Sequence, residues 1–212
     1  MKHIPSAIPA ALLAEIAALL AGGNRVILGL AGTPGSGKST LAEALATAFG
    51  DIAIVVPMDG FHLANVELAR LARADRKGAS DTFDAAGFVA LLARIRAATT
   101  ETVYAPLFRR DLEEAIAGAI PVQPTHRLII TEGNYLLSTH GAWAGVRPLL
   151  DQCWFVDIDA ATRVERLVAR HVSFGRTPEA ARDWVLTSDE ANARGIEQSR
   201  VRADRLVRWP DV

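Results

Sequence analysis

The chain has 212 residues, a formal net charge of −1 and hydrophobic residues at half of its positions. This length suits one α/β domain with a sizeable core, so residues 1–212 are expected to form a single domain. The near-neutral charge excludes a chain that is globally built to bind nucleic acid or an anionic membrane. The single cysteine, Cys153, rules out an internal disulfide and suits a reducing, cytoplasmic setting.

The first predicted elements are a helix, a strand and a second helix. Residues 9–21 are mostly apolar, but Glu15 interrupts them, and the stretch is too short to cross a membrane. An amphipathic helix packed on a sheet is therefore favoured over a signal peptide. The apolar run at 26–31 predicts a buried parallel strand at about 25–31. Apolar residues then recur at helical spacing towards Phe49.

A phosphate-binding pattern lies between that strand and the second helix. It fits G-x-x-x-x-G-K-[ST] and reads Gly32-Thr33-Pro34-Gly35-Ser36-Gly37-Lys38-Ser39. Glycines let the backbone wrap a triphosphate, and the helix start offers free N–H groups. In this role Lys38 neutralises β/γ-phosphate charge, Ser39 ligates Mg²⁺, and Thr40 belongs to the nucleotide site. The alternative is a glycine-rich turn with an incidental lysine, which the flanking strand and helix disfavour.

Strands and helices alternate through the rest of the chain. Core strands are predicted at 52–56, 128–131, 154–158 and 206–209, and a short strand at 103–108 with 119–122 as its partner. Helices are predicted after the caps Asp84, Asp159 and Thr177, the last reaching about Gln198. This order predicts an α/β fold with a doubly wound, mostly parallel five-stranded sheet and helices on both faces.

Ligands in such sheets bind at the carboxyl ends of the strands, which brings the phosphate loop, Asp59 and Glu132 together. Asp59 stands where phosphoryl transfer needs a carboxylate that orients a hydroxyl and takes its proton. Glu132 is expected to hold a Mg²⁺ water or a substrate hydroxyl. For both, the alternative is a turn carboxylate beside glycine. His62 is either a substrate contact or a hydrogen-bonded surface group.

Arginines dominate the segment after the 154–158 strand. Arg163, Arg166 and Arg170 share one helix face, and residues 160–178 are predicted to form a small helical lid. A lid needs guanidinium groups that clamp the transferring phosphoryl group, and Arg170 is the favoured one. The alternative is a solvated charged face. The arginines nearer the carboxyl terminus are expected to form a solvated surface and not a nucleic-acid-binding patch, because they lack interleaved aromatic residues and a basic background: Arg194, Arg200, Arg202, Arg205 and Arg208.

With these residues assembled, the chain resembles the pantothenate kinase, uridine kinase and phosphoribulokinase group of phosphate-loop kinases. The resemblance rests on residues 32–40, 58–62, 77–84, 103–106 and 131–134, and on the tail 192–207. It implies a P-loop NTPase fold, ATP, Mg²⁺ and transfer of the γ-phosphoryl group to a small-molecule hydroxyl. It also implies that Asp59 is the catalytic carboxylate, that Arg170 is the lid arginine and that Asn192 touches the acceptor.

One stretch departs from the group. Pantothenate kinases have a motif close to Val-Tyr-Ser-His-Leu-x-Tyr-Asp, whereas residues 103–110 read Val-Tyr-Ala-Pro-Leu-Phe-Arg-Arg here. Tyr104 and Arg109 are kept as acceptor-site candidates. The arginine pair suits an anionic acceptor if it points inward, and a solvated loop if it does not. The nearest subgroup is labelled nucleoside/nucleotide kinase-like or fructose transport system kinase.

The sequence thus predicts a cytoplasmic ATP-dependent small-molecule kinase that binds neither nucleic acid nor membrane. The acceptor is left open among sugars, nucleosides, pantothenate-like alcohols and their phosphates, and the oligomeric state is open, a homodimer included. The alternative is a nucleotide-switched regulatory ATPase without an acceptor. No Asn-Lys-x-Asp or Leu-Ser-Gly-Gly-Gln motif is present, which disfavours a GTPase and a transport ATPase.

Overall fold

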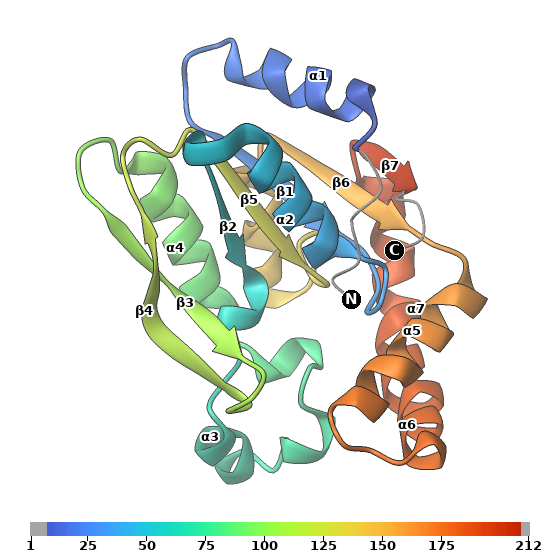
Figure 1. The fold of residues 1–212 in the computed structure, drawn as a ribbon. Coiled ribbons are helices and arrows are strands. Elements are labelled where there is room, and N and C mark those ends of the chain that lie inside the picture. Colours follow the sequence, from blue (N-terminus) through green and yellow to red (C-terminus); the bar gives the residue numbers. More distant parts are fainter. Residues whose placement is uncertain (1–7, 209–212) are drawn as a thin grey trace.

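A computed structural model describes residues 8–208, apart from the side chains at 188, 189 and 191 (Figure 1). Within this range one sheet has five strands in the order β2-β5-β1-β6-β7, and every neighbouring pair is parallel. The strands are β1 (Val26–Ala31), β2 (Ala53–Pro57), β5 (Leu128–Gly133), β6 (Gln152–Asp157) and β7 (Arg205–Arg208). The predicted five-stranded parallel sheet is confirmed; position 209, expected in the last strand, lies outside the described residues.

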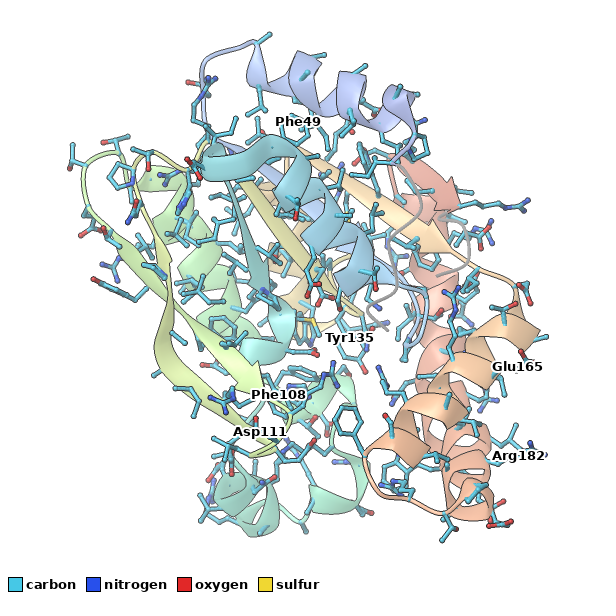
Figure 2. The ribbon with its side chains drawn as sticks, viewed as in Figure 1. Phe49, Phe108, Asp111, Tyr135, Glu165 and Arg182 are labelled. Atoms are coloured by element: carbon cyan, nitrogen blue, oxygen red, sulfur yellow. The ribbon has the colours of Figure 1, made fainter. Side chains whose placement is uncertain are left out.

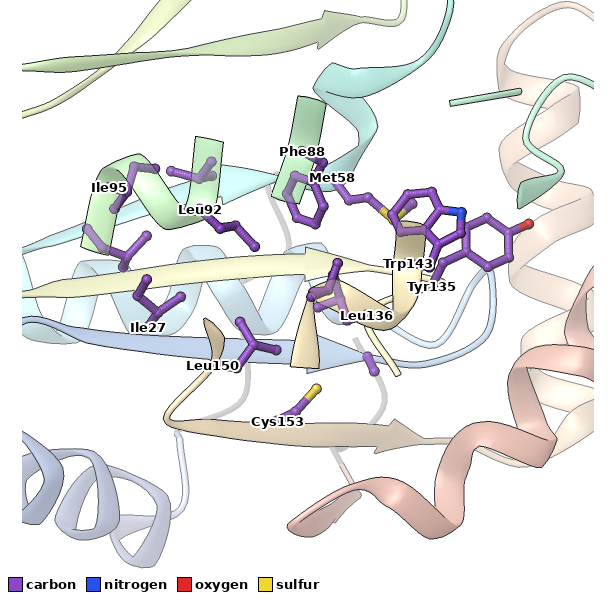
Figure 3. Packing of buried hydrophobic residues seen from close by; sticks show 14 of the residues in the cluster. Ile27, Met58, Phe88, Leu92, Ile95, Tyr135, Leu136, Trp143, Leu150 and Cys153 are labelled. Atoms are coloured by element: carbon purple, nitrogen blue, oxygen red, sulfur yellow. The ribbon is translucent and has the colours of Figure 1, made fainter. Parts of the chain in front are cut away.

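Helices cover both faces of this sheet, as predicted. On one face lie α1 (Ala10–Leu20) and α2 (Lys38–Phe49); on the other lie α4 (Ala85–Ala97), residues 135–150 and α7 (Glu190–Ser199). The two faces divide the side chains of β1 by alternation: Ile27 packs with the α4 side, and Leu28 and Leu30 with the α1–α2 side. Figure 3 shows the α4 side of this packing. Because both faces are buried, β1 is apolar throughout.

Helix starts follow the predicted caps. The Asp84 carboxylate accepts from the Gly87 N–H at 2.8 Å, and the Asp159 carboxylate accepts from the Thr162 N–H at 2.9 Å. Asp159 begins α5 (Ala160–Ser173), and Thr177 caps α6 (Pro178–Trp184). The continuous helix expected up to about 198 is interrupted. A π-helical turn (Val185–Asp189) separates α6 from α7, so the helix is locally wider between them.

Two further elements stand beside the sheet. Strands β3 (Val103–Arg109) and β4 (Glu114–Val122) form an antiparallel hairpin, with β4 starting earlier than the predicted 119–122. Helix α3 (Asn65–Arg70) was not predicted. Figure 1 shows the hairpin and α3 on one side of the carboxyl ends of the strands, and α5 and α6 on the other. No helix within residues 8–208 is long and apolar enough to cross a membrane.

The carboxyl-terminal arginines are tied to the fold more than was expected. Arg200 pairs with Asp157 at 3.0 Å, Arg202 donates to the Leu137 carbonyl at 2.7 Å, and Arg205 pairs with Glu15 of α1. These contacts join the last segment to β6 and to the first helix. These arginines lie at the surface, as expected, and in addition hold the end of the chain against the rest of the fold.

Candidate active site

The phosphate loop joins β1 to α2 in a conformation that requires glycine. Gly35 and Gly37 have φ angles of 80° and 90°, in the left-handed region that side chains disfavour. A Cβ on Gly35 would lie 2.8 Å from Cγ of Leu167 in α5. The loop therefore packs directly against α5, and its glycines are needed both for the turn and for that contact.

Two polar side chains at this loop are buried and have few hydrogen-bond partners. The Lys38 ammonium donates to the Thr33 carbonyl at 2.9 Å, and the Ser36 hydroxyl has no hydrogen-bond partner within residues 8–208. Burial lowers the pKa of Lys38 to about 8, although the nearby Glu132 and Asp59 carboxylates oppose this shift. A buried ammonium with only a neutral partner and an unpartnered hydroxyl are groups that a bound phosphate would satisfy.

Glu132 lies at the centre of the carboxyl edge of the sheet. In the pairing register it stands opposite Leu30 of β1 and Pro57 of β2. The Ser39 hydroxyl donates to Oε1 of Glu132 at 2.9 Å. Burial raises the pKa of Glu132, and the Asp59 carboxylate raises it further. A hydroxyl and a carboxylate side by side are oxygen ligands of the kind that Mg²⁺ prefers, so this pair fits the ion.

Asp59 lies in a short 3₁₀ turn (Met58–Phe61) directly after β2. The turn is held on both sides: a Cβ on Gly133 of β5 would lie 2.5 Å from the Met58 side chain, and one on Gly60 would lie 2.3 Å from the Pro106 carbonyl of the hairpin. The Asp59 carboxylate is partly exposed and faces Arg110, with 3.6 Å between Oδ2 and Nη2. Asp59 is thus a carboxylate on a fixed backbone, open to the cleft.

His62 forms an aromatic wall beside Asp59. Its ring lies between Phe83 and Phe108, with centroid distances of 4.0 and 4.5 Å. Burial lowers the pKa of His62, and the charges of Lys77 and Arg110 lower it further, while Asp59 opposes them. Nδ1 is 2.7 Å from the Asp59 carbonyl, which can only accept. The neutral ring therefore has its proton on Nδ1, and Nε2 remains a hydrogen-bond acceptor.

The opposite wall is the arm formed by α5 and α6. Arg166, Arg170 and Phe174 of this arm line the cleft, and the guanidinium of Arg176 lies 4.2 Å from the centre of the Trp184 ring. Arg163 does not join them, because it is buried and paired with Glu190 of α7. Figure 2 shows Glu165 and Arg182 on the outer side of the arm, away from the cleft.

A cleft of about 900 Å³ separates the two walls. It brings together most of the residues predicted from the sequence: Pro34, Gly35, Gly37, Lys38, Ser39, Thr40, Asp59, His62, Glu132, Arg170 and Asn192. Gly32, Thr33 and Ser36 complete the loop behind them. The lining also contains residues that were not candidates, among them Lys77, Phe108 and Phe174. Lys77 is one of only three lysines in the chain, a signal that was available in the sequence.

Tyr104 and Arg109 do not line the cleft, which corrects their expected place at the acceptor. Tyr104 is 59% exposed between the buried Val103 and Ala105, so strand alternation turns it outward. Arg109 donates to both carboxylate oxygens of Asp111, at 2.8 and 2.6 Å. Phe108 and Asp111 lie near the tip of the hairpin (Figure 2). Of the arginine pair, only Arg110 faces inward.

Comparisons with known proteins agree with this geometry. Residues 27–209 match the Phosphoribulokinase / Uridine kinase family. A Schizosaccharomyces pombe protein described as a candidate uridine kinase is 34% identical over 195 residues, covering 87% of this chain and 83% of the relative. The ATP-dependent kinase-like protein notR' of Aspergillus versicolor is 35% identical over 159 residues, covering 71% of this chain and 92% of its own.

A solved structure shows the same arrangement. A Silicibacter sp. TM1040 protein described as a candidate fructose transport system kinase superimposes with a TM-score of 0.85 and 39% identity, covering 96% of this chain and 100% of its own. The parallel sheet with a phosphate loop after β1 is the P-loop NTPase fold. The chain therefore belongs to the phosphoribulokinase and uridine kinase family of P-loop kinases.

Proposed function

We propose that the chain is a cytoplasmic enzyme that transfers the γ-phosphoryl group of ATP to a hydroxyl of a small molecule. One observation carries the proposal. Lys38, the Ser39–Glu132 pair and Asp59 converge at the carboxyl ends of three neighbouring parallel strands and face Arg170 across one cleft. A nucleotide switch requires the phosphate loop, but it does not require an exposed carboxylate such as Asp59 in the cleft beside that loop.

The donor site is the phosphate loop. Its main-chain N–H groups, Lys38 and the Ser36 hydroxyl would hold the phosphates of ATP. Ser39 and Glu132 would hold Mg²⁺, which when bound would neutralise charge on the phosphate oxygens. Arg170 lies close enough to Lys38 for its charge to lower the pKa of that lysine. An anion between the two cations would relieve this repulsion.

Asp59 is the residue that we assign to the acceptor. Its carboxylate would accept a hydrogen bond from the acceptor hydroxyl, orient the oxygen towards the γ-phosphorus and take the proton as the new bond forms. Arg166 and Arg170 would stabilise the charge of the transferring group once the α5–α6 arm, the proposed lid, closes over it. Positioning and electrostatics would supply most of the rate enhancement.

The test is Asp59→Asn, with Asp51→Asn as the matched control. Asp51 is exposed and lies before β2, at the opposite end of the strand from Asp59. We expect Asp59→Asn to lower acceptor-dependent ADP release about 100- to 10,000-fold and to leave the Kd of ATP within about threefold of wild type. Asp51→Asn should change neither. Acceptor-dependent turnover that survives in Asp59→Asn would contradict the assigned role.

A further inference from the structure

Two cations, Lys77 and Arg110, stand on the acceptor side of the cleft, where their carboxylate partners Glu113 and Asp59 are held only at long distances of 3.9 and 3.6 Å. We infer that the acceptor is a small hydroxylated anion, with a carboxylate or phosphate group that binds Arg110 and Lys77 while its hydroxyl meets Asp59. The inference rests on the proposed kinase function and names the chemical class of its substrate. It also assigns Arg110, and not Arg109, as the residue that selects that class.

The charges of the cleft divide into a donor side and an acceptor side. Lys38 and Arg170 stand at the phosphate loop, where ATP supplies the balancing negative charge. On the other side, Lys77 lies 5.1 Å from the centre of the Phe108 ring and Arg110 lies 3.6 Å from Asp59, so both cations border the aromatic wall. Glu113 is the ion-pair partner of Lys77, and Asp59 is that of Arg110, so Asp59 would have to give up this pair to serve as a base. An anionic group on the acceptor would replace Asp59 as the partner of Arg110 and leave the Asp59 carboxylate to the hydroxyl.

Arg110 has the donors for such a group. Within residues 8–208 its side chain pairs with Asp59 at 3.6 Å, a distance that is too long for a hydrogen bond. Its side chain is 47% exposed and lines the cleft. The neighbouring Arg109 has already committed its guanidinium to both oxygens of Asp111. A planar guanidinium fork with free N–H groups matches a carboxylate or a phosphate.

Lys77 adds a charge that is fixed in place. Its ammonium donates to the Asn65 side-chain oxygen at 2.7 Å and to the Glu113 carbonyl at 2.5 Å, and its side chain is only 17% exposed. These partners are neutral, and the Glu113 carboxylate is further away at 3.9 Å. The ammonium also lies 5.1 Å from the centre of the Phe108 ring. Lys77 is therefore held in place by two neutral hydrogen-bond acceptors, and its ion-pair partner Glu113 is distant and largely exposed.

The aromatic wall favours a compact polyol over a nucleoside. Phe83 and Phe108 flank the His62 ring, and His62 and Lys77 both lie against Phe108. These contacts leave less of the Phe83 and Phe108 ring surface for a stacked base. The Nε2 edge of His62 can accept an O–H hydrogen bond, which a second hydroxyl of the acceptor would supply.

The experiment measures ADP release from MgATP with pairs of acceptors, each an anionic compound and its neutral analogue (its neutral twin). The pairs are D-glycerate against glycerol for the carboxylate, and glucose 6-phosphate against glucose for the phosphate, with uridine as a neutral nucleoside. We expect an anion to exceed its neutral twin at least about tenfold in kcat/KM. The pair that responds identifies which anionic group is bound.

Arg110→Ala should then raise KM for the anion about 10- to 100-fold and remove most of the advantage of the anion over its neutral analogue. Arg109→Ala, one residue away and outside the cleft, should match wild type, and Arg110→Lys should recover part of the loss. Equal turnover of charged and neutral twins, or preference for uridine, overturns the inference. So does an Arg110→Ala enzyme whose kcat falls equally for all acceptors, since Arg110 would then only position Asp59. Failure of every compound to raise ADP release counts instead against the kinase function itself.

Discussion

Gly60 sets the distance between the turn that carries Asp59 and the hairpin that carries Arg110. A Cβ at this position would lie 2.3 Å from the Pro106 carbonyl oxygen and 2.8 Å from its carbon. Ordinary C···O contacts are about 3.3 Å, so Gly60→Ala must separate two backbone segments by about 1 Å. No side-chain rotation can relieve the clash, because the nearest atoms belong to the main chain. The substitution therefore moves the proposed base relative to the acceptor wall.

Both stability and activity should respond. Overpacking of this kind costs about 1–3 kcal/mol of the free energy of unfolding. A displacement of about 1 Å at the reacting groups lowers the rate about 100-fold. We therefore expect Gly60→Ala to fold, to unfold at lower urea concentration than wild type, and to lose about 100-fold in kcat/KM for ADP release with an accepted substrate.

Gly195→Ala is the matched control for this change. Gly195 is exposed in α7, and a Cβ there would meet nothing within 4 Å. Alanine should stabilise the helix by about 0.5–1 kcal/mol and leave kcat/KM unchanged. Urea unfolding followed by circular dichroism, with kinetics on the same preparations, measures both quantities. A Gly60→Ala protein with wild-type stability and kcat/KM would refute the idea that close backbone contact positions Asp59.

Two further predictions concern the donor site and the core. Because burial lowers the pKa of Lys38 to about 8 and bound phosphates would raise it again, ATP binding above that pH requires uptake of a proton. The Kd of ATP, measured by calorimetry, should be level below about pH 8 and rise by about tenfold per pH unit above it; a level profile up to about pH 9.5 would contradict this. Phe88→Ala should lower the free energy of unfolding by about 3–5 kcal/mol, since Phe88 is fully buried against Phe61 and Trp143. Phe174→Ala, at a residue that is 59% exposed, should change the free energy of unfolding by less than about 0.5 kcal/mol. Equal decreases for the two variants would show that burial does not determine the loss of stability.

The sequence was sufficient for the parts of the fold that are locally encoded. The run of apolar residues in β1 reads as a strand buried on both faces, and the caps at Asp84 and Asp159 mark helix starts by their own hydrogen bonds. Helix α3 was missed because Leu68 is its only buried residue, which leaves no apolar period to detect. The first half of β4 was missed for a similar reason, since residues 114–118 are largely exposed and alternate weakly.

The donor side of the cleft could be predicted from the sequence, whereas the proposed acceptor side could be predicted only in part. The donor side lies in residues 32–40, where spacing alone fixes which groups can meet a phosphate. The acceptor wall is assembled from separate segments, and Lys77 reaches it by hydrogen bonds to Asn65 and to the Glu113 carbonyl.

Side-chain direction on that wall is a tertiary property. Arg109 points away from the cleft because it donates hydrogen bonds to Asp111. Its neighbour Arg110 follows the end of β3 and lines the cleft. A substitution at Asp111 would therefore release a second guanidinium next to the first without touching the phosphate loop. If Arg110 selects the acceptor as proposed, changes in the hairpin would alter acceptor choice without altering the phosphate loop, so the motif that identifies the family would not identify the substrate.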